Sequence, residues 1–97
     1  MNDLSLDWAY RMAATIVINL RRDHPQLNEL GAIKVAWGTL KDSHPHHKDR
    51  LESAGYVAEI VRAIRDIGDR RKRPMLHPDA EDLARSRLRL PLRAPQK

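Results

Sequence analysis

Residues 6–22 read LDWAYRMAATIVINLRR, and this stretch decides the class of the fold. Its apolar side chains recur at steps of three and four, the spacing of one face of an α-helix. The stripe consists of Trp8, Ala9, Met12, Ala13, Ile16, Val17 and Leu20. Pro25 ends the segment, because a proline disfavours the helical conformation at the residue before it. We therefore predict a helix over 6–22.

Two further segments carry the same helical period. The second covers 27–41, with a face made of Leu27, Leu30, Ile33, Trp37 and Leu40. The third covers 46–71, with a stripe of Leu51, Ala54, Val57, Ala58, Val61, Ile64 and Ile67 that Ile60 widens. Within this third segment, Ala54–Gly55 is the expected place for a kink or a break, because glycine destabilises a helix interior.

A short fourth helix is predicted to begin at His77–Pro78. Proline suits the first position of a helix, and Asp79, Glu81 and Asp82 suit the positive end of its dipole. Residues 87–93 then alternate basic and apolar side chains, which predicts an extended arm. The expected fold is all-α, a small bundle of three main helices with a short C-terminal helix and an extended basic arm. We divide it into a helical bundle domain over 1–73 and the short helix with its arm over 74–97.

The composition fits one small domain inside the cell. A chain of 97 residues is long enough for a single domain. It has no cysteine, which excludes disulfides and thiolate chemistry. The apolar run from residue 13 to 18 is far shorter than the ~20 residues of a membrane span. The segment after Met1 lacks the basic start of a signal peptide. We expect a cytoplasmic protein that does not contact a membrane.

Positive charge is concentrated in the last third of the chain. Residues 1–69 hold nine Lys or Arg against ten Asp or Glu, whereas residues 70–97 hold nine against three. The net charge of +5 therefore divides into −1 for the body and +6 for the tail. Such an asymmetry suggests a binding tail.

The basic third predicts contact with nucleic acid or a nucleoprotein complex. Each lysine or arginine that neutralises a phosphate releases a condensed counterion. The candidate contacts are Arg70, Arg71, Lys72, Arg73, Arg85, Arg87, Arg89 and Arg93. This part of the chain has no aromatic residue on which bases could stack, so we expect weakly sequence-specific binding to phosphates. Small basic helical regulators of phages and other mobile elements share these traits, although no motif supports that resemblance.

An alternative is a protein-binding inhibitor or adaptor. Leu88, Leu90 and Leu92 alternate with arginines, and leucines add nothing to a purely electrostatic tail. An extended arm of this kind could place its leucines in an apolar groove and its arginines on an acidic rim. The groove could belong to another protein or to a second copy, which would give an arm-exchanged homodimer.

Neither catalysis nor a cofactor is expected. The chain has no glycine-rich phosphate loop, no nucleophile elbow and no zinc-protease motif. His44, His46 and His47 cluster between two predicted helices, but their spacing matches no standard zinc pattern. We predict no catalytic residue and no metal ligand, and we interpret the histidines as a solvated loop.

Overall fold

The computed structural model describes residues 6–68, 74 and 77–90, and these residues form helices and loops without a strand. The elements are α1 (Asp7–Asp23), α2 (Glu29–Ser43), the 3-10 turn η1 (Pro45–His47), α3 (Lys48–Ser53), α4 (Val57–Gly68) and α5 (Pro78–Arg87). The all-α prediction is confirmed. The parts of the predicted third helix at 69–71 and of the predicted arm at 91–93 lie outside the described residues.

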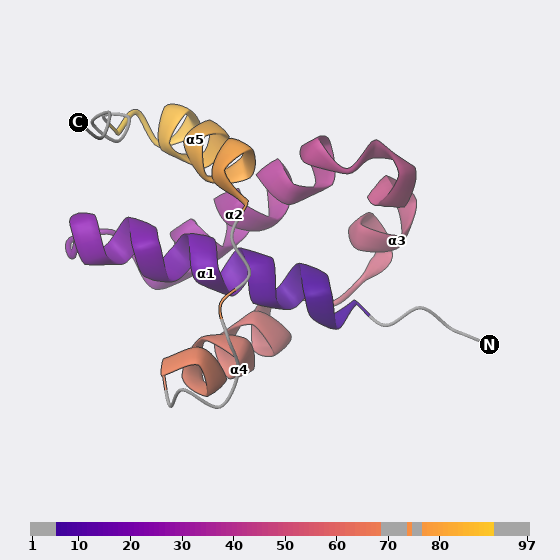
Figure 1. The fold of residues 1–97 in the computed structure, drawn as a ribbon, viewed down its shortest axis with the longest axis horizontal. Coiled ribbons are helices and arrows are strands. Elements are labelled where there is room, and N and C mark those ends of the chain that lie inside the picture. Colours follow the sequence, from indigo (N-terminus) through magenta and orange to yellow (C-terminus); the bar gives the residue numbers. More distant parts are fainter. Residues whose placement is uncertain (1–5, 69–73, 75–76, 91–97) are drawn as a thin grey trace.

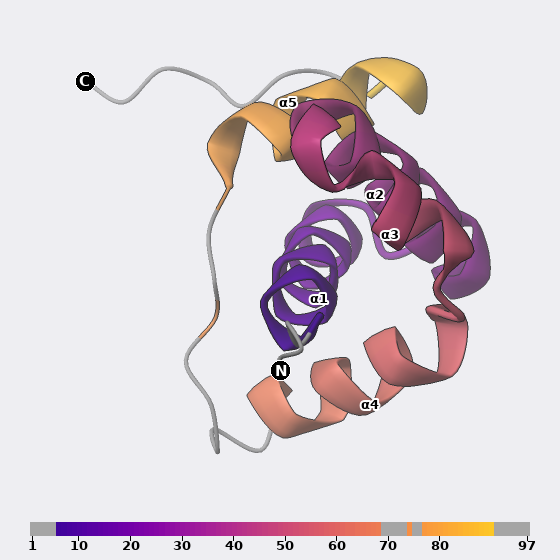
Figure 2. The same cartoon turned by 90° about the vertical axis from the view of Figure 1, so that its right-hand side faces the viewer.

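Helix α1 is the centre of the fold. It contacts α2, α4 and α5, and Figure 2 views it nearly end-on, with α2 and α5 on one side and α4 on the other. The predicted apolar stripe is present, and Ala14, Thr15 and Asn19 are buried beside it. Because neighbours cover more than one side of α1, its buried surface is wider than a single stripe.

Helix α2 runs beside α1 and begins at Asn28, whose side chain accepts a hydrogen bond from the backbone N–H of Gly31. Ile33, Trp37 and Leu40 are buried as predicted, but Leu30 is 45% exposed. Ala32, Ala36 and Thr39 are buried in addition. The predicted face was therefore wrong at Leu30, because α2 packs against both α1 and α5 and its buried side is turned toward that pair.

The predicted third helix is broken where the sequence indicated. Ala54 has an extended backbone (φ −82°, ψ 139°), so α3 ends at Ser53 and α4 begins at Val57. This break separates the helical phases of the two segments, and a single stripe cannot run through both. As a result Val57 and Ala58 are exposed, contrary to the prediction, while Leu51, Ile60 and Ala63 are buried and Val61 is half-buried.

A stack of three aromatic rings joins the helices around α1. The indole of Trp37 lies between the rings of Tyr10 and Tyr56, with centroids 5.5 and 5.1 Å away and nearly parallel planes. Its Nε1 donates a hydrogen bond to the carbonyl of Leu51 at 3.0 Å. The largest core side chain thus contacts α1, α3 and Tyr56, the residue before α4. Figure 1 shows where these helices lie.

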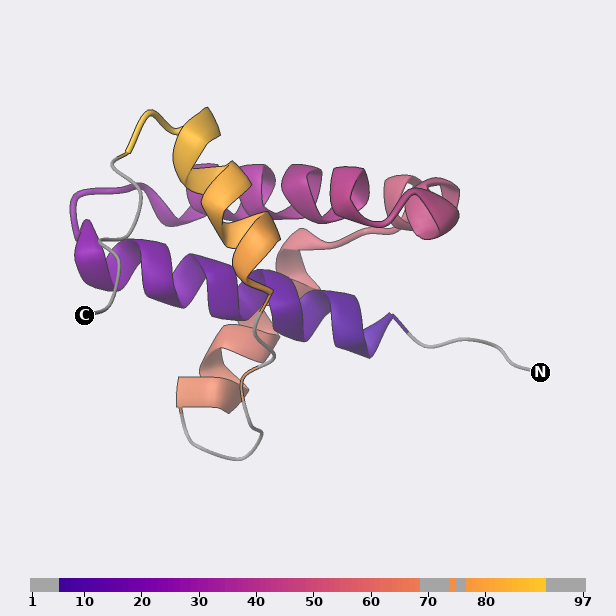
Figure 3. The same ribbon diagram turned by 45° about the horizontal axis from the view of Figure 1, so that its top comes forward.

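Helix α5 lies across α2 and α1, as Figure 3 shows. It begins at Pro78 as predicted, and the Nδ1 atom of His77 accepts a hydrogen bond from the N–H of Ala80. Ala80 and Ala84 belong to the same buried cluster as the apolar residues of α1 and α2. The sequence boundary at residue 73 therefore separates two stretches of chain that share one core.

Candidate binding surface

The structure describes part of the predicted binding surface. Arg85, Arg87, Leu88, Arg89 and Leu90 belong to α5 and the turn that follows it. The remaining candidates lie outside the described residues, and they are Arg70, Arg71, Lys72, Arg73, Leu92 and Arg93. Where the described candidates lie decides which of them are able to meet a partner.

Arg85 is buried inside the fold. Its side chain is 2% exposed, and its Nη2 atom donates to Asp23 Oδ2 at 2.8 Å and to Glu81 Oε2 at 3.2 Å. The other oxygen of Glu81 accepts a hydrogen bond from Asn19 Nδ2 at 3.0 Å. A guanidinium enclosed in this way cannot reach a phosphate on another molecule, so Arg85 serves the packing of α5 on α1.

The pKa shifts of Arg85 and Asp23 follow from their ion pairs. Burial by itself would lower the pKa of Arg85, but hydrogen bonds to Asp23 and Glu81 outweigh it and raise that pKa. The hydrogen bond from Arg85 holds the pKa of Asp23 below its ordinary value. Both groups are therefore charged at neutral pH, and the pair stabilises the contact between α5 and α1.

Arg87 is held on the surface of α2. Its Nη2 atom donates to Asp42 Oδ2, and this hydrogen bond lowers the pKa of Asp42. A Cβ atom added at Gly38 would lie 3.5 Å from Arg87 Nη1, so the guanidinium passes close over the backbone of Gly38 on its way to Asp42. The side chain is 41% exposed, and a partner that used it would compete with Asp42.

The segment after Arg87 turns back instead of extending. The N–H of Arg89 donates to the carbonyl of Ser86, and the N–H of Leu90 donates to the carbonyl of Arg85. These two bonds are those of a Schellman motif, in which the Arg89 position takes a left-handed backbone; its φ is 58°. Leu88 and Leu90 pack against the core. The predicted extended arm was therefore wrong over 87–90, because the helix cap and leucine burial outweigh the period-two pattern.

The histidines behave differently from the predicted solvated loop. His44 and His47 both pack on Trp8, with ring centroids 5.1 and 5.4 Å from the indole, and His77 packs edge-on against His44 at 5.0 Å. His46 alone among the three predicted loop histidines is exposed. Sequence reasoning missed Trp8 and His77 as members of this cluster, although the position of His77 before Pro78 marked it as a helix cap.

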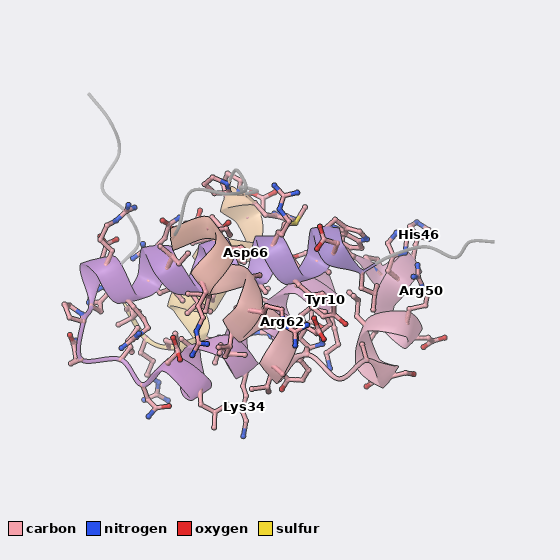
Figure 4. The ribbon with its side chains drawn as sticks, turned by 90° about the horizontal axis from the view of Figure 1, so that it is seen from below. Tyr10, Lys34, His46, Arg50, Arg62 and Asp66 are labelled. Atoms are coloured by element: carbon pink, nitrogen blue, oxygen red, sulfur yellow. The ribbon has the colours of Figure 1, made fainter. Side chains whose placement is uncertain are left out.

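A polar notch lies between α1 and α4. It is lined by Asp7, Tyr10, Glu59, Arg62, Ala63 and Asp66. Figure 4 shows Tyr10 and Arg62 close together there, with Asp66 farther along α4. Burial and the charge of Glu59 raise the pKa of Tyr10, and its hydroxyl donates to the carbonyl of Gly55 at 3.3 Å. Among the described residues, no group of three His, Asp or Glu side chains is placed to hold a metal ion.

Comparisons with known protein families, with curated proteins and with solved structures gave no match for this chain. Within the described residues, no helix combines the length and the apolar character needed to cross a membrane.

Proposed function

We propose that this chain is a non-enzymatic binding protein that contacts the phosphates of a nucleic acid or a nucleoprotein complex. Arg70, Arg71, Lys72 and Arg73 are its main contacts, and Arg89 and Arg93 add to them. The observation that supports this proposal is the location of the uncompensated charge. The described residues hold twelve Lys or Arg and eleven Asp or Glu, so they contribute +1 of the total net charge of +5.

Ion pairs within the fold reduce the number of arginines that are available to contact phosphates. Arg85 and Arg87 are neutralised by Glu81, Asp23 and Asp42 of the same chain. We therefore leave both arginines out of the proposed phosphate contacts. The four consecutive basic residues between α4 and α5 are the densest positive charge in the sequence. Phosphate contacts made by such a run position a duplex without reading its bases.

A role without catalysis is also part of the proposal. The shifted pKa values of Asp23, Asp42 and Arg85 have their causes in ion pairs between helices, and that of Tyr10 in its burial and the nearby Glu59. These causes are structural, so none of the four groups needs a catalytic role to explain its shift.

The protein-binding alternative receives less support. It relied on three leucines of an extended arm, and two of them, Leu88 and Leu90, pack against the core of their own chain. An apolar groove on a partner would have to displace them from that core.

The direct test is a binding titration with labelled duplexes of unrelated sequence at about 50 mM salt, where electrostatic attraction is little screened. We expect the wild type to bind all of them with similar affinity. Replacing Arg70, Arg71, Lys72 and Arg73 by Gln should abolish or strongly weaken binding. A matched control replaces Lys34, Lys48, Arg62 and Arg65 by Gln, which removes the same charge from described helix surfaces. Absence of binding by the wild type, or equal losses in both variants, would overturn the proposal.

A further inference from the structure

The imidazole cluster around Trp8 joins four elements at one end of the fold. Trp8 comes from α1, His44 is the C-cap of α2, His47 ends η1, and His77 is the N-cap of α5. All four side chains are half-buried, and each touches at least one other ring of the cluster. Three side chains of the one type that changes charge between about pH 5 and 8 thus meet at this junction.

His77 is bonded in a way that requires its neutral form. Its Nδ1 atom accepts the hydrogen bond from the N–H of Ala80 at 3.3 Å, so Nδ1 carries a lone pair and the ring proton is on Nε2. Protonation would place a hydrogen on Nδ1 and remove this acceptor. It would also bring a positive charge to the N-terminus of α5, where the helix dipole is already positive.

His44 is bonded in the opposite way. Its Nδ1 atom lies 3.0 Å from the carbonyl of Leu40, which can only accept, so this nitrogen is the donor. Protonation of the ring keeps that bond, and the negative end of the α2 dipole favours the charge. Because the His44 and His77 rings are 5.0 Å apart, a charge on His44 adds repulsion against a charged His77.

Within the part of the chain that the structure describes, the other charged groups of α1, α5 and η1 near this junction do not reverse the effect. On α5 itself, Asp79 is exposed to solvent and Glu81 is bonded to Asn19 and Arg85. On α1, Asp7 lines the notch on the α4 side, and Arg11 is one turn beyond Trp8 and carries a permanent charge. From η1, His47 meets the cluster through Trp8 and adds a further positive charge when it is protonated.

We propose that the cluster of Trp8, His44, His47 and His77 is a pH-sensitive clasp that holds the first turn of α5 at neutral pH and releases it in mild acid. The unfolded chain does not make the bond from Ala80 to His77, so protonation of His77 removes a contact of the folded state alone and stability falls as the pH falls. The device is independent of any partner. It also lies next to the basic segment 70–73 in the sequence, since α5 is the first helix after that segment.

The test compares thermal unfolding at pH 7.5 and pH 5.5 for the wild type, His77→Asn and His46→Asn. Asparagine is a good N-cap that does not titrate, and His46 is the exposed histidine outside the cluster. Between pH 7.5 and pH 5.5 we expect the melting temperatures of the wild type and of His46→Asn to fall by a similar amount, about 4–8 °C if one N-cap is lost. The melting temperature of His77→Asn should fall by less than half as much over the same pH change. An equal loss in His77→Asn and the wild type would overturn the proposal.

A second measurement on the wild type decides the matter even if His77→Asn does not fold. Hydrogen exchange of the Ala80 amide, corrected for the intrinsic effect of pH, reports on the cap directly. Its protection should fall about fivefold at pH 5.5, the change expected for a lost N-cap, while the amide of Ala14 in α1 should change less. Unchanged relative protection of Ala80 would exclude the clasp.

Discussion

Arg85 on α5 donates a hydrogen bond to Asp23 at the end of α1, and the two residues are 62 positions apart in the chain. The guanidinium is almost completely buried, whereas the Asp23 side chain is 43% exposed. Glu81, one turn before Arg85, is buried with it and is held by Asn19 of α1. The side of α5 that faces α1 therefore carries the buried ion pair of Arg85 and Glu81 together with small apolar side chains.

The first prediction concerns the buried ion pair of Arg85 and Glu81. Replacing Arg85 by Met should lower the free energy of unfolding by about 3 kcal/mol, because the buried carboxylate of Glu81 would lose its ion pair with Arg85. Chemical denaturation followed by circular dichroism measures the change. Adding Glu81→Gln to the Arg85→Met variant should recover most of the loss, since glutamine can still accept from Asn19 without carrying a charge. Removing an exposed pair by Arg62→Met should cost less than about 1 kcal/mol. Equal costs for Arg85→Met and Arg62→Met would contradict the buried pair.

The second prediction is a loss of stability in strong acid. The hydrogen bonds from Arg85 and Arg87 lower the pKa values of Asp23 and Asp42 in the folded protein. A carboxyl with a depressed pKa stabilises the fold above its ordinary pKa, near 4, and that stabilisation is lost as the pH falls through the folded value. Stability should thus decline below about pH 4, a range separate from that of the histidines. The Asp23→Asn and Asp42→Asn double variant should be less stable at pH 7 and should show a smaller decline. A decline as steep as that of the wild type would show that other carboxyls cause it.

The third prediction uses the left-handed backbone of Arg89, whose φ is 58°. A residue with a Cβ atom pays about 1 kcal/mol for this conformation, and glycine does not. Arg89→Gly should therefore raise the free energy of unfolding by about 1 kcal/mol. Arg89→Ala removes the same charge but keeps the Cβ atom, and it should give no such gain. If alanine stabilised the protein as much as glycine, the charge of Arg89 and not its backbone would be the cause.

The fourth prediction concerns Gly38 in the middle of α2. Glycine costs about 1 kcal/mol relative to alanine inside a helix. A Cβ atom at this position would meet Arg87 Nη1 at 3.5 Å, an ordinary contact. Gly38→Ala should thus stabilise the protein by up to about 1 kcal/mol. Gly38→Leu should gain less, because its larger side chain must displace Arg87 from Asp42, and thermal unfolding of the two variants tests this order.

The helices were predictable from the sequence, but the faces that they bury were only partly so. The helical period of the apolar residues and the residues typical of helix ends correctly predicted the start of α5 and the break at Ala54. Leu30 and Val57 were assigned to the core because a stripe read along one helix assumes a single packing direction. In the structure α2 packs mainly on α1 and α5, and also contacts α3 and α4, while α4 restarts its helical phase after the break. Those facts depend on partners distant in sequence, which no local pattern records.

The binding surface was less predictable for a related reason. An arginine in an acidic helix looks the same in sequence whether it faces solvent or a carboxylate from another helix. Arg85 and Arg87 were assigned to a partner, and their ion pairs with Asp23 and Asp42 join residues at least 45 positions apart. The spacing of Glu81 and Arg85 was the one local signal of the buried pair, since residues four apart share a helix face.

The last prediction tests the proposed phosphate contacts through their dependence on salt. If Arg70, Arg71, Lys72 and Arg73 each neutralise one phosphate of B-form DNA, the logarithm of affinity should fall with the logarithm of salt concentration with a slope of about −3.6 from these four contacts. Replacing the four by Gln should flatten the slope by a similar amount, and equally on unrelated duplexes, because phosphate contacts carry no base information.

Two further variants show whether the arginines that are paired inside the fold take part. Arg87→Gln should leave the slope nearly unchanged, because Arg87 is already neutralised by Asp42. Serine at Leu88, Leu90 and Leu92 should weaken the fold by uncovering the core that Leu88 and Leu90 touch, but should leave the slope intact while the protein remains folded. A slope that changes as much with Arg87→Gln as with one of the four basic residues would show that Arg87 leaves Asp42 to bind. If the fourfold Gln variant leaves the slope unaffected, segment 70–73 does not make the phosphate contacts.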